Sequence, residues 1–375
     1  MTRVTRSEDT TKAAKLYLAL ELSEKSWKLV FSDGQRTREA GVRPRDLEGV
    51  LAAVAKARRW AGGAELPVAS CYEAGRDGFW LHRALVEAGI ANVVLDAASI
   101  EVDRRAKRAK TDRLDGRKLV ALLERLDRGD GAVRCVRVPS AAVEDGRRVE
   151  RELLRLAQER TAHTNRVRSL LALVGHAVKN LKTVEGWLAA GARGAGGQVA
   201  GEALQREIRR ELERIALLNA QAKAVQKERQ RAASAGTTDC DRTTRELAKV
   251  HGIGVNAATV LSQEFYGWRD FANRRQVAGA AGLTPTPYAS GREDREQGIS
   301  KAGNARVRWI GVQLAWVWLR LQPESKLARW YRTRFGGGSP RLRKIGIVAL
   351  ARRLLVDLWR YLKHGIIPEG VKMAA

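Results

Sequence analysis

Apolar residues in the first third of the chain occur in short runs separated by amphipathic stretches. The runs 15–22 and 26–31 flank a three-residue polar turn, which predicts a β-hairpin. Alternation and buried-type runs predict three further strands, at residues 36–42, 66–72 and 92–95. Apolar positions at helical spacing predict three helices, at residues 45–60, 79–88 and 112–126.

The order of these elements indicates an α/β fold for residues 1–135. A hairpin sheet extended by strand–helix units is the order expected of a ribonuclease-H-like (RuvC-like) domain. The alternative is a doubly wound nucleotide-binding fold, which needs a glycine-rich phosphate loop after the first strand. The sequence after residue 22 has no such loop. A ribonuclease-H-like domain is therefore the expectation.

The middle of the chain, residues 140–236, is predicted to form an all-α, coiled-coil arm. Apolar residues recur at alternating three- and four-residue intervals over residues 153–174, with Arg160 and His163 as a polar interruption. Residues 204–225 repeat this spacing, and a glycine-rich loop separates the two stretches. The pattern is typical of an antiparallel helical hairpin or of a dimerisation arm.

A third domain, also helical, is predicted for residues 243–375, after a linker at residues 232–244. It contains a His-Gly-Ile-Gly turn between two helical patterns, the arrangement of a helix-hairpin-helix. The backbone N–H groups of Gly252 and Gly254 are candidates for binding a DNA phosphate. The alternative is an ordinary tight turn between helices, where glycine is also common.

The net charge is far from neutral. Lys and Arg number 69 against 42 Asp and Glu, which gives a formal charge of +27. Such a charge predicts polyanionic partners, with nucleic acid as the first candidate and an anionic membrane surface as the second. No apolar run reaches the roughly 18 residues of a transmembrane helix, and the N-terminus lacks a signal-peptide pattern. We expect a cytoplasmic protein that binds nucleic acid and no membrane.

The C-terminal domain concentrates much of this charge. Residues 243–375 contain 23 Lys or Arg against 9 Asp or Glu, a formal +14, and six of the ten tryptophans. Tryptophans among basic helices can stack on bases. Trp316 and Trp318, however, lie in an apolar run, and we expect both in the core.

Four acidic residues have the placement of a metal site. Glu21 closes the first predicted strand, Glu73 closes the fourth, and Asp112 and Asp115 begin a helix with a spacing that puts them on one face. Converging carboxylates repel one another unless cations occupy the site, and Mg²⁺ or Mn²⁺ accepts such oxygen ligands. The alternatives are helix N-terminal stabilisation for the aspartates and a simple turn for Glu73.

A serine in the C-terminal domain is a candidate nucleophile. Pro285 and Pro287 prevent a regular helix, and Ser290 with Gly291 is expected in the loop that follows. The polar and basic residues that follow it closely are Lys301, Asn304, Arg306 and Arg308. Cations beside a serine suit attack on a phosphodiester, because they offset the charge that develops on the phosphate. The alternative is ordinary Ser-Gly turn chemistry.

A basic run precedes the two aspartates, and we expect it to contact a nucleic-acid backbone near the cut. Its members are Arg104, Arg105, Lys107, Arg108 and Lys110. The alternative is a solvated charged face. Together with Gly252, Gly254 and the four residues after Ser290, this run completes the predicted nucleic-acid-binding set.

These motifs resemble one family over nearly the whole chain, from Leu16 to about Leu362. The resemblance is carried by LALELSEKSWKL, CYEAG, KTDRLDGRKL and the block HGIGVNAAT, AGLTPTPYASG and GISKAGNARVR. The family is that of insertion-sequence transposases related to the Piv site-specific DNA invertase, the bridge-RNA-guided recombinases.

The resemblance implies that the four carboxylates hold the metal and that Ser290 forms a transient phosphoserine link to DNA. It also implies a noncoding guide RNA, which pairs with the element ends and the target DNA. A homodimer or homotetramer is implied as well, with an active site that uses two subunits. The family usually has aspartate where this chain has Glu21, a change that keeps the ligand type. Ser300 is the alternative nucleophile.

Two other functions fit parts of the pattern. A Holliday-junction resolvase, or another structure-specific nuclease, would cut with metal-activated water and would leave Ser290 dispensable. A non-catalytic nucleic-acid-binding scaffold would need neither the carboxylates nor the serine. The presence of both sets in one chain favours the recombinase.

Overall fold

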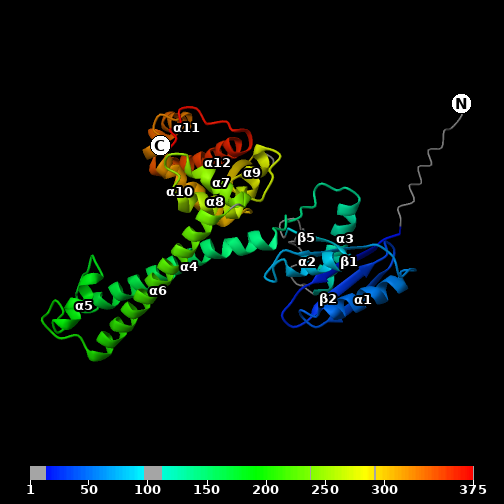
Figure 1. The fold of residues 1–375 in the computed structure, drawn as a ribbon, viewed down its shortest axis with the longest axis horizontal. Coiled ribbons are helices and arrows are strands. Elements are labelled where there is room, and N and C mark those ends of the chain that lie inside the picture. The colour runs from blue at the N-terminus through cyan, green and yellow to red at the C-terminus, as the bar shows by residue number, and fades with distance from the viewer. Residues whose placement is uncertain (1–13, 97–111, 237, 291–292, 375) are drawn as a thin grey trace. The chain divides into compact units, whose positions relative to one another are not determined.

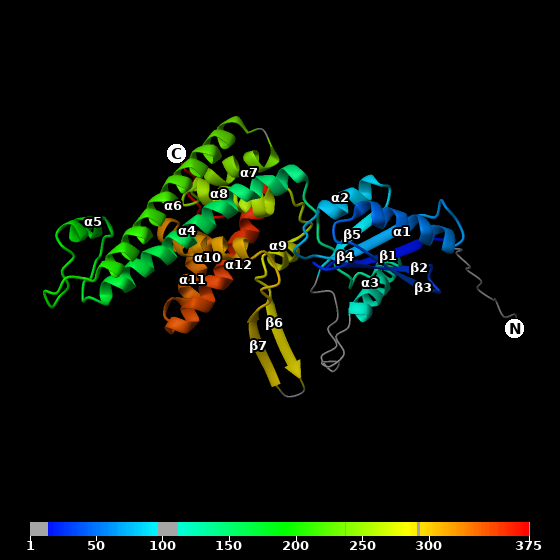
Figure 2. The same cartoon turned by 90° about the horizontal axis from the view of Figure 1, so that it is seen from below.

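The computed structural model describes residues 14–96, 112–236, 238–290 and 293–374, and for residues 112–115, 232–235, 287–290 and 293–297 it describes the backbone alone. The chain divides into two units, Met1–Val138 and Pro139–Ala375. In the described ranges the first unit is a sheet with helices, and the second is helical with one two-stranded hairpin (Figure 1 and Figure 2).

Five strands form the sheet of the first unit: β1 (Leu16–Glu21), β2 (Trp27–Ser32), β3 (Thr37–Val42), β4 (Val68–Glu73) and β5 (Ala91–Leu95). Their order is β3-β2-β1-β4-β5. β1, β2 and β3 pair antiparallel, while β4 runs parallel to β1 and β5 runs parallel to β4. Each strand that the sequence predicts is present, with its bounds displaced by at most two residues.

Side chains alternate between the two faces of this sheet. Leu16, Leu18 and Leu20 pack with α1 (Leu47–Trp60) and α2 (Trp80–Glu87). Ala19 packs on the other face with α3 (Asp112–Asp127). Figure 2 shows α1 and α3 on opposite sides of the strands. Because both faces are covered, β1 is apolar along nearly its whole length.

The second unit begins with an arm of two long helices, α4 (Ala141–Ala172) and α6 (Glu202–Ala235). Leu156 packs with Leu218, and Val167 packs with Ile208, so the two helices run antiparallel.

The polar interruption in the arm is filled from the facing helix. His163 Nδ1 lies 2.5 Å from a carboxylate oxygen of Glu211, and Arg160 donates to Asn219 across 3.4 Å. Glu211 is 2% exposed. Burial alone would raise the pKa of its carboxyl, but the contacts with His163 and Arg214 outweigh burial and lower it.

The end of the arm carries a helix that the sequence does not predict, α5 (Lys182–Ala189). Its Val184 and Leu188 are buried against Val167 and Leu171 of α4. The two buried residues are four apart, which is the helical spacing that could have indicated α5.

The predicted linker at residues 232–244 is wrong for most of its length. α6 continues to Ala235, and α7 (Asp239–Ala248) begins almost at once. The side chain of Thr238 accepts from the backbone of Asp241, whose side chain accepts from the backbone of Thr238 in turn. This capping box satisfies the first N–H groups of α7, and a polar sequence that resembles a linker is therefore a helix start.

The remaining elements form a helical body with one hairpin (Figure 2). They are α8 (Val255–Leu261) with the π-helical turn Ser262–Tyr266, α9 (Arg274–Ala280), the strands β6 (Pro285–Ser290) and β7 (Glu293–Ile299), α10 (Ala305–Leu321), α11 (Lys326–Tyr331) with a second π-helical turn, Arg332–Gly336, and α12 (Pro340–His364). No helix in the described ranges is long and apolar enough to cross a bilayer.

The expectation for the two tryptophans is half right. Trp318 is 2% exposed, and its indole N–H donates to Ser325 Oγ across 2.9 Å. Trp316 is 49% exposed. Residues two apart on a helix are separated by about 200° around its axis, so only one of the pair can face the core.

Candidate active site

Glu21 and Glu73 lie at the same edge of the sheet. They are the last residues of β1 and β4, which run parallel with Leu20 opposite Tyr72. By alternation, both glutamates lie on the face of Ala19 and Cys71, which is the face that α3 covers. The sheet therefore brings these two predicted metal ligands together on neighbouring strands.

The direction of α3 places its first turn toward this edge. At its other end, Asp127 accepts hydrogen bonds from Tyr17 Oη (2.9 Å) and Lys15 Nζ (2.6 Å), at the beginning of β1. α3 therefore runs antiparallel to β1. Asp112 and Asp115 stand in the first turns of α3, at the end nearer to Glu21 and Glu73.

Gly116 allows α3 to approach the sheet closely just after Asp115. A Cβ atom at this position would lie 2.6 Å from Val30 Cγ2. Val30 stands opposite Ala19 on the neighbouring strand, and its branched side chain has little rotamer freedom. The glycine thus sets the height of the turn that carries the two aspartates above the sheet.

We expect Gly116→Ala to destabilise the first unit by about 1–3 kcal/mol, the usual effect of overpacking a core. The matched control is Gly41→Ala on β3, where an added Cβ would have no heavy atom within 4 Å. Urea unfolding of both variants measures the difference. Equal stability of the two would contradict a close approach at Gly116.

The donor set fits a hard divalent cation. Glutamate and aspartate supply only oxygen atoms, the ligand type that Mg²⁺ and Mn²⁺ share. Among the side chains that the structure describes, no group of three or more His, Cys, Asp or Glu could hold a metal ion. That description covers Glu21 and Glu73 but not the side chains of Asp112 and Asp115.

The predicted serine ends a strand instead of lying in a loop. Residues 285–290 form β6, with Ser290 opposite Glu293 of β7. The expectation of a loop is wrong here, because a two-stranded hairpin leaves one edge of each strand unpaired and so tolerates proline. A bulge between Pro285 and Pro287 absorbs the irregularity. Figure 2 shows that β6 runs away from the helical body, and Ser290 is the last residue of this strand.

The alternative serine, Ser300, lies at the base of the same hairpin. Its backbone N–H donates to Thr284 O across 2.8 Å, and its hydroxyl accepts from the Thr284 hydroxyl across 3.1 Å. The next residue, Lys301, has a positive φ of 55° and donates its N–H to Gly282 O. Ser300 is thus engaged in closing the hairpin.

Asn304 and Arg308 are also built into this base. The Asn304 side chain caps α10 by accepting from the N–H groups of Arg306 and Val307. Arg308 Nη1 donates to the carbonyls of Ala281 (3.2 Å) and Lys301 (3.3 Å). These predicted nucleic-acid ligands therefore also hold the chain where the hairpin leaves the body.

A buried carboxylate that the sequence reading missed connects this base to the arm. Glu264 is 1% exposed and accepts from Arg151 Nε (2.8 Å) and Nη2 (3.1 Å) of α4. It also accepts from Asn304 Nδ2 (3.0 Å), and Arg147 Nε and Arg306 Nε each lie 4.0 Å away. Burial would raise the pKa of Glu264, but the hydrogen bonds from Arg151 and Asn304 and the charge of Arg147 lower it below the ordinary value.

One signal in the sequence could have identified Glu264. It interrupts the mostly apolar stretch 255–266, and an acid in a buried helix requires partners.

The predicted helix-hairpin-helix turn lies between α7 and α8. Gly252 has a positive φ of 92°, and Gly254 is the N-terminal cap residue of α8. His251 contacts the C-terminal tail through Lys372 O, and Gln322 Nε2 donates to His251 O across 2.7 Å. The five basic residues of the run Arg104–Lys110 that we expect to contact nucleic acid lie outside the described residues.

Comparison with known proteins adds an independent finding. Residues 244–329 match the family described as "Transposase IS116/IS110/IS902 family". The chain is 40% identical over 374 residues to the putative transposase y4rJ of Sinorhizobium fredii, covering 96% of this chain and 94% of that protein. It is 33% identical over 92 residues to the transposase for insertion sequence element IS1328 of Yersinia enterocolitica, covering 24% and 28% of the two chains.

Proposed function

The chain belongs to the IS116/IS110/IS902 family of insertion-sequence transposases, and from this premise we propose that it cuts and rejoins DNA through a phosphoserine at Ser290. The carboxylates of the first unit assist by holding Mg²⁺ or Mn²⁺. The observation that carries the metal-assisted mechanism is the strand register, which sets Glu21 beside Glu73 on the face covered by α3.

The proposed reaction has two transfers. Ser290 Oγ loses its proton and attacks the phosphorus of a DNA phosphodiester, and the sugar oxygen of the cut strand leaves as a hydroxyl. A sugar hydroxyl of the strand to be joined then attacks the same phosphorus, and the serine oxygen leaves. Each step breaks one P–O bond and forms another, so the bond energy is kept.

The protein's own groups have separate tasks in this proposal. Glu21, Glu73, Asp112 and Asp115 would hold the metal, which when bound offsets negative charge on the phosphate. The hairpin carries Ser290, and the hydrogen bonds of Ser300, Lys301 and Asn304 fix the base of that hairpin. These bonds orient the nucleophile through the backbone.

Further expectations stay part of the proposal. We propose a ribonuclease-H-like fold for the first unit, and the sheet order β3-β2-β1-β4-β5 supports it. We also propose that the turn at Gly252 and Gly254 is a helix-hairpin-helix that binds DNA phosphates. A noncoding guide RNA and a homodimer or homotetramer complete the proposed assembly, and the net charge of +27 suits such polyanions.

A covalent-trapping assay tests the proposal. The protein is mixed with element-end DNA, flanking RNA and Mg²⁺, then denatured and separated to reveal protein–DNA adducts. We expect an adduct with the natural protein and none with Ser290→Ala. Ser300→Ala, at the base of the same hairpin, is the matched control and should still form the adduct.

The other outcomes identify the competing functions. If the protein cuts DNA without forming an adduct, and this cutting persists in Ser290→Ala, the protein would be a nuclease that uses water. Adduct loss in Ser300→Ala alone would move the nucleophile to Ser300. If the protein binds DNA but does not cut it, the protein would be a non-catalytic nucleic-acid-binding scaffold.

A further inference from the structure

A groove in the second unit lies beside the base of the β6–β7 hairpin, which carries Ser290. Its volume is about 880 Å³, and it is lined by residues of α9, the ends of β6 and β7, α11 and α12. Pro285 and Ile299, which pair with each other where the hairpin begins, are part of the lining. The groove and the strand that ends in Ser290 therefore share residues.

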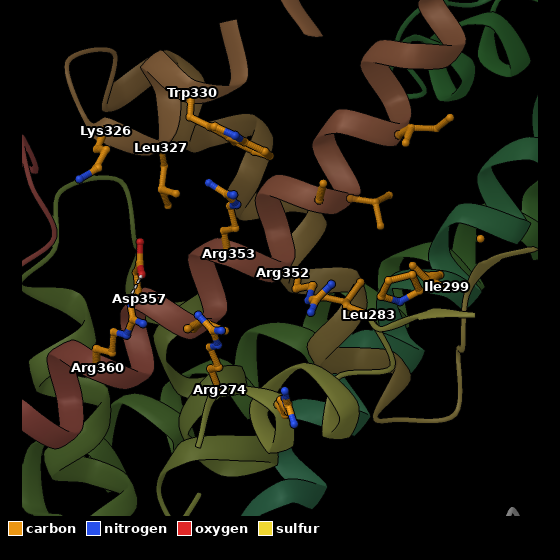
Figure 3. Close-up of a pocket in the computed structure, with 17 residues that line it drawn as sticks. Arg274, Leu283, Ile299, Lys326, Leu327, Trp330, Arg352, Arg353, Asp357 and Arg360 are labelled. Carbon is orange, nitrogen blue, oxygen red and sulfur yellow. Dashed lines mark hydrogen bonds and ion pairs between the residues drawn. The ribbon is translucent and has the colours of Figure 1, made fainter. Parts of the chain in front are cut away.

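The lining of the groove is strongly basic. Six cations line it against one carboxylate, Asp357; they are Arg274, Arg275, Lys326, Arg352, Arg353 and Arg360. Figure 3 shows that Arg274, from α9, and the three arginines of α12 border one open space.

Four of these cations form no close ion pair with the side chains that the structure describes. Lys326 is paired with Glu369 (3.0 Å) and Arg360 with Asp357 (3.4 Å). Among the side chains that the structure describes, no carboxylate lies within 4 Å of the other four, which are Arg274, Arg275, Arg352 and Arg353. Unpaired like charges gathered around one hollow repel each other, so a bound polyanion would relieve that repulsion.

Apolar side chains also line the groove. They include Leu283, Ile299, Leu327, Trp330, Val348 and Val356. Arg353 lies over the Trp330 ring, with 3.9 Å between the guanidinium carbon and the ring centroid. A lining of both apolar and cationic side chains matches a ligand with flat apolar surfaces on a phosphate chain, which describes unpaired bases on their backbone.

We propose that this groove binds an unpaired DNA strand next to the phosphate that Ser290 attacks. The assignment to DNA rests on the proposed function, because the strand attacked at the hairpin is the nucleic acid nearest the groove. From Pro285 to Ser290 the hairpin spans about 17 Å at the usual rise of a strand, a reach of a few nucleotides. In a duplex the faces of the bases are covered by the neighbouring base pairs, so a duplex would not use the apolar part of the lining.

The test measures binding without chemistry, in the Ser290→Ala background. A fluorescein-labelled, twelve-nucleotide single-stranded DNA of mixed sequence is titrated by fluorescence anisotropy over a range of salt concentrations. The test variant is Arg352→Gln with Arg353→Gln. We expect its Kd to rise about tenfold and its salt slope to fall by roughly 1.4, since each lost phosphate contact removes about 0.7 for a single strand.

The matched control is Arg209→Gln with Arg210→Gln on α6, which removes two exposed arginines from the same unit. We expect the control to keep the Kd within about twofold. A second test variant, Arg352→Lys with Arg353→Lys, retains the charge and should bind nearly as the parent does. This variant separates the loss of charge from a local folding defect.

Several outcomes would overturn the proposal. Equal weakening in the control would mean that only the general charge attracts DNA. A further outcome is that twelve-nucleotide RNA or duplex DNA binds more tightly than the single strand and loses this binding in the same test variant. That result would assign the groove to RNA or to duplex DNA instead. Equal competition by a twelve-residue glutamate peptide would indicate an acidic protein partner. Since Ser290 is already absent, none of these results depends on whether the serine is the nucleophile.

Discussion

Glu73→Gln is expected to reduce DNA cutting by about 1,000-fold while leaving the fold intact. Glu73 ends β4 and is exposed, so its loss removes no core packing. If Glu73 holds a metal beside Glu21, the neutral amide is a poorer ligand, and the metal's contribution of several kcal/mol to the transition state is lost. Each 1.36 kcal/mol corresponds to roughly a tenfold change in rate.

The control for this prediction is Glu87→Gln. Glu87 is exposed on α2, which packs on the face of the sheet opposite to α3. The measurement is the cutting rate with element-end DNA, together with Mn²⁺ affinity by calorimetry. Full cutting and unchanged Mn²⁺ affinity in Glu73→Gln would remove this residue from the metal site. Unchanged affinity with lost cutting would indicate a role other than metal binding.

The second large effect is expected on stability. Glu264→Ala should destabilise the second unit by about 3–5 kcal/mol, because removing one partner of a buried ion pair leaves the others charged and unpaired. Arg151 loses its bidentate acceptor, and Asn304 loses one of its hydrogen bonds. Glu213→Ala, at an exposed position of α6, is the control and should change stability by less than about 0.5 kcal/mol. Urea unfolding compares the two.

The same residue predicts a dependence on pH. The pKa of Glu264 is lower in the folded chain than its ordinary value of 4.5. A lowered carboxyl pKa contributes stability that is present above pH 4.5 and is lost as the pH falls through the folded pKa. We therefore expect Glu264→Gln to lose less stability than the natural protein between about pH 5 and pH 3. Parallel curves of unfolding free energy against pH would contradict this ion-pair role.

Local periodicity predicted the first unit well. Glu21 and Glu73 could be placed at strand ends because apolar runs of six or so residues mark each strand, and parallel neighbours share an edge. The position of α3 over that edge could not be obtained this way. It depends on the contact of Asp127 with Tyr17, which joins residues 110 apart in the sequence.

In the second unit, the features that could not be predicted from the sequence depend on contacts between segments that are far apart in the chain. Glu264 is connected to Arg151 and Asn304, which lie 113 and 40 positions away. The basic groove combines arginines of α9 and α12 that no local pattern relates. Trp316 was placed wrongly because an apolar run does not say which side of a helix faces the core.

The polar break in the arm has a consequence for its reach. If α4 slid along α6 by one turn, Glu211 would leave His163 and keep only its contact with Arg214 on its own helix, so this buried carboxylate would lose one of its partners. The contact with His163 therefore favours one offset of the two helices. With 32 residues and a rise of about 1.5 Å per residue, α4 is about 48 Å long. Whatever binds at the α5 end is therefore held at a constant distance from the base of the arm.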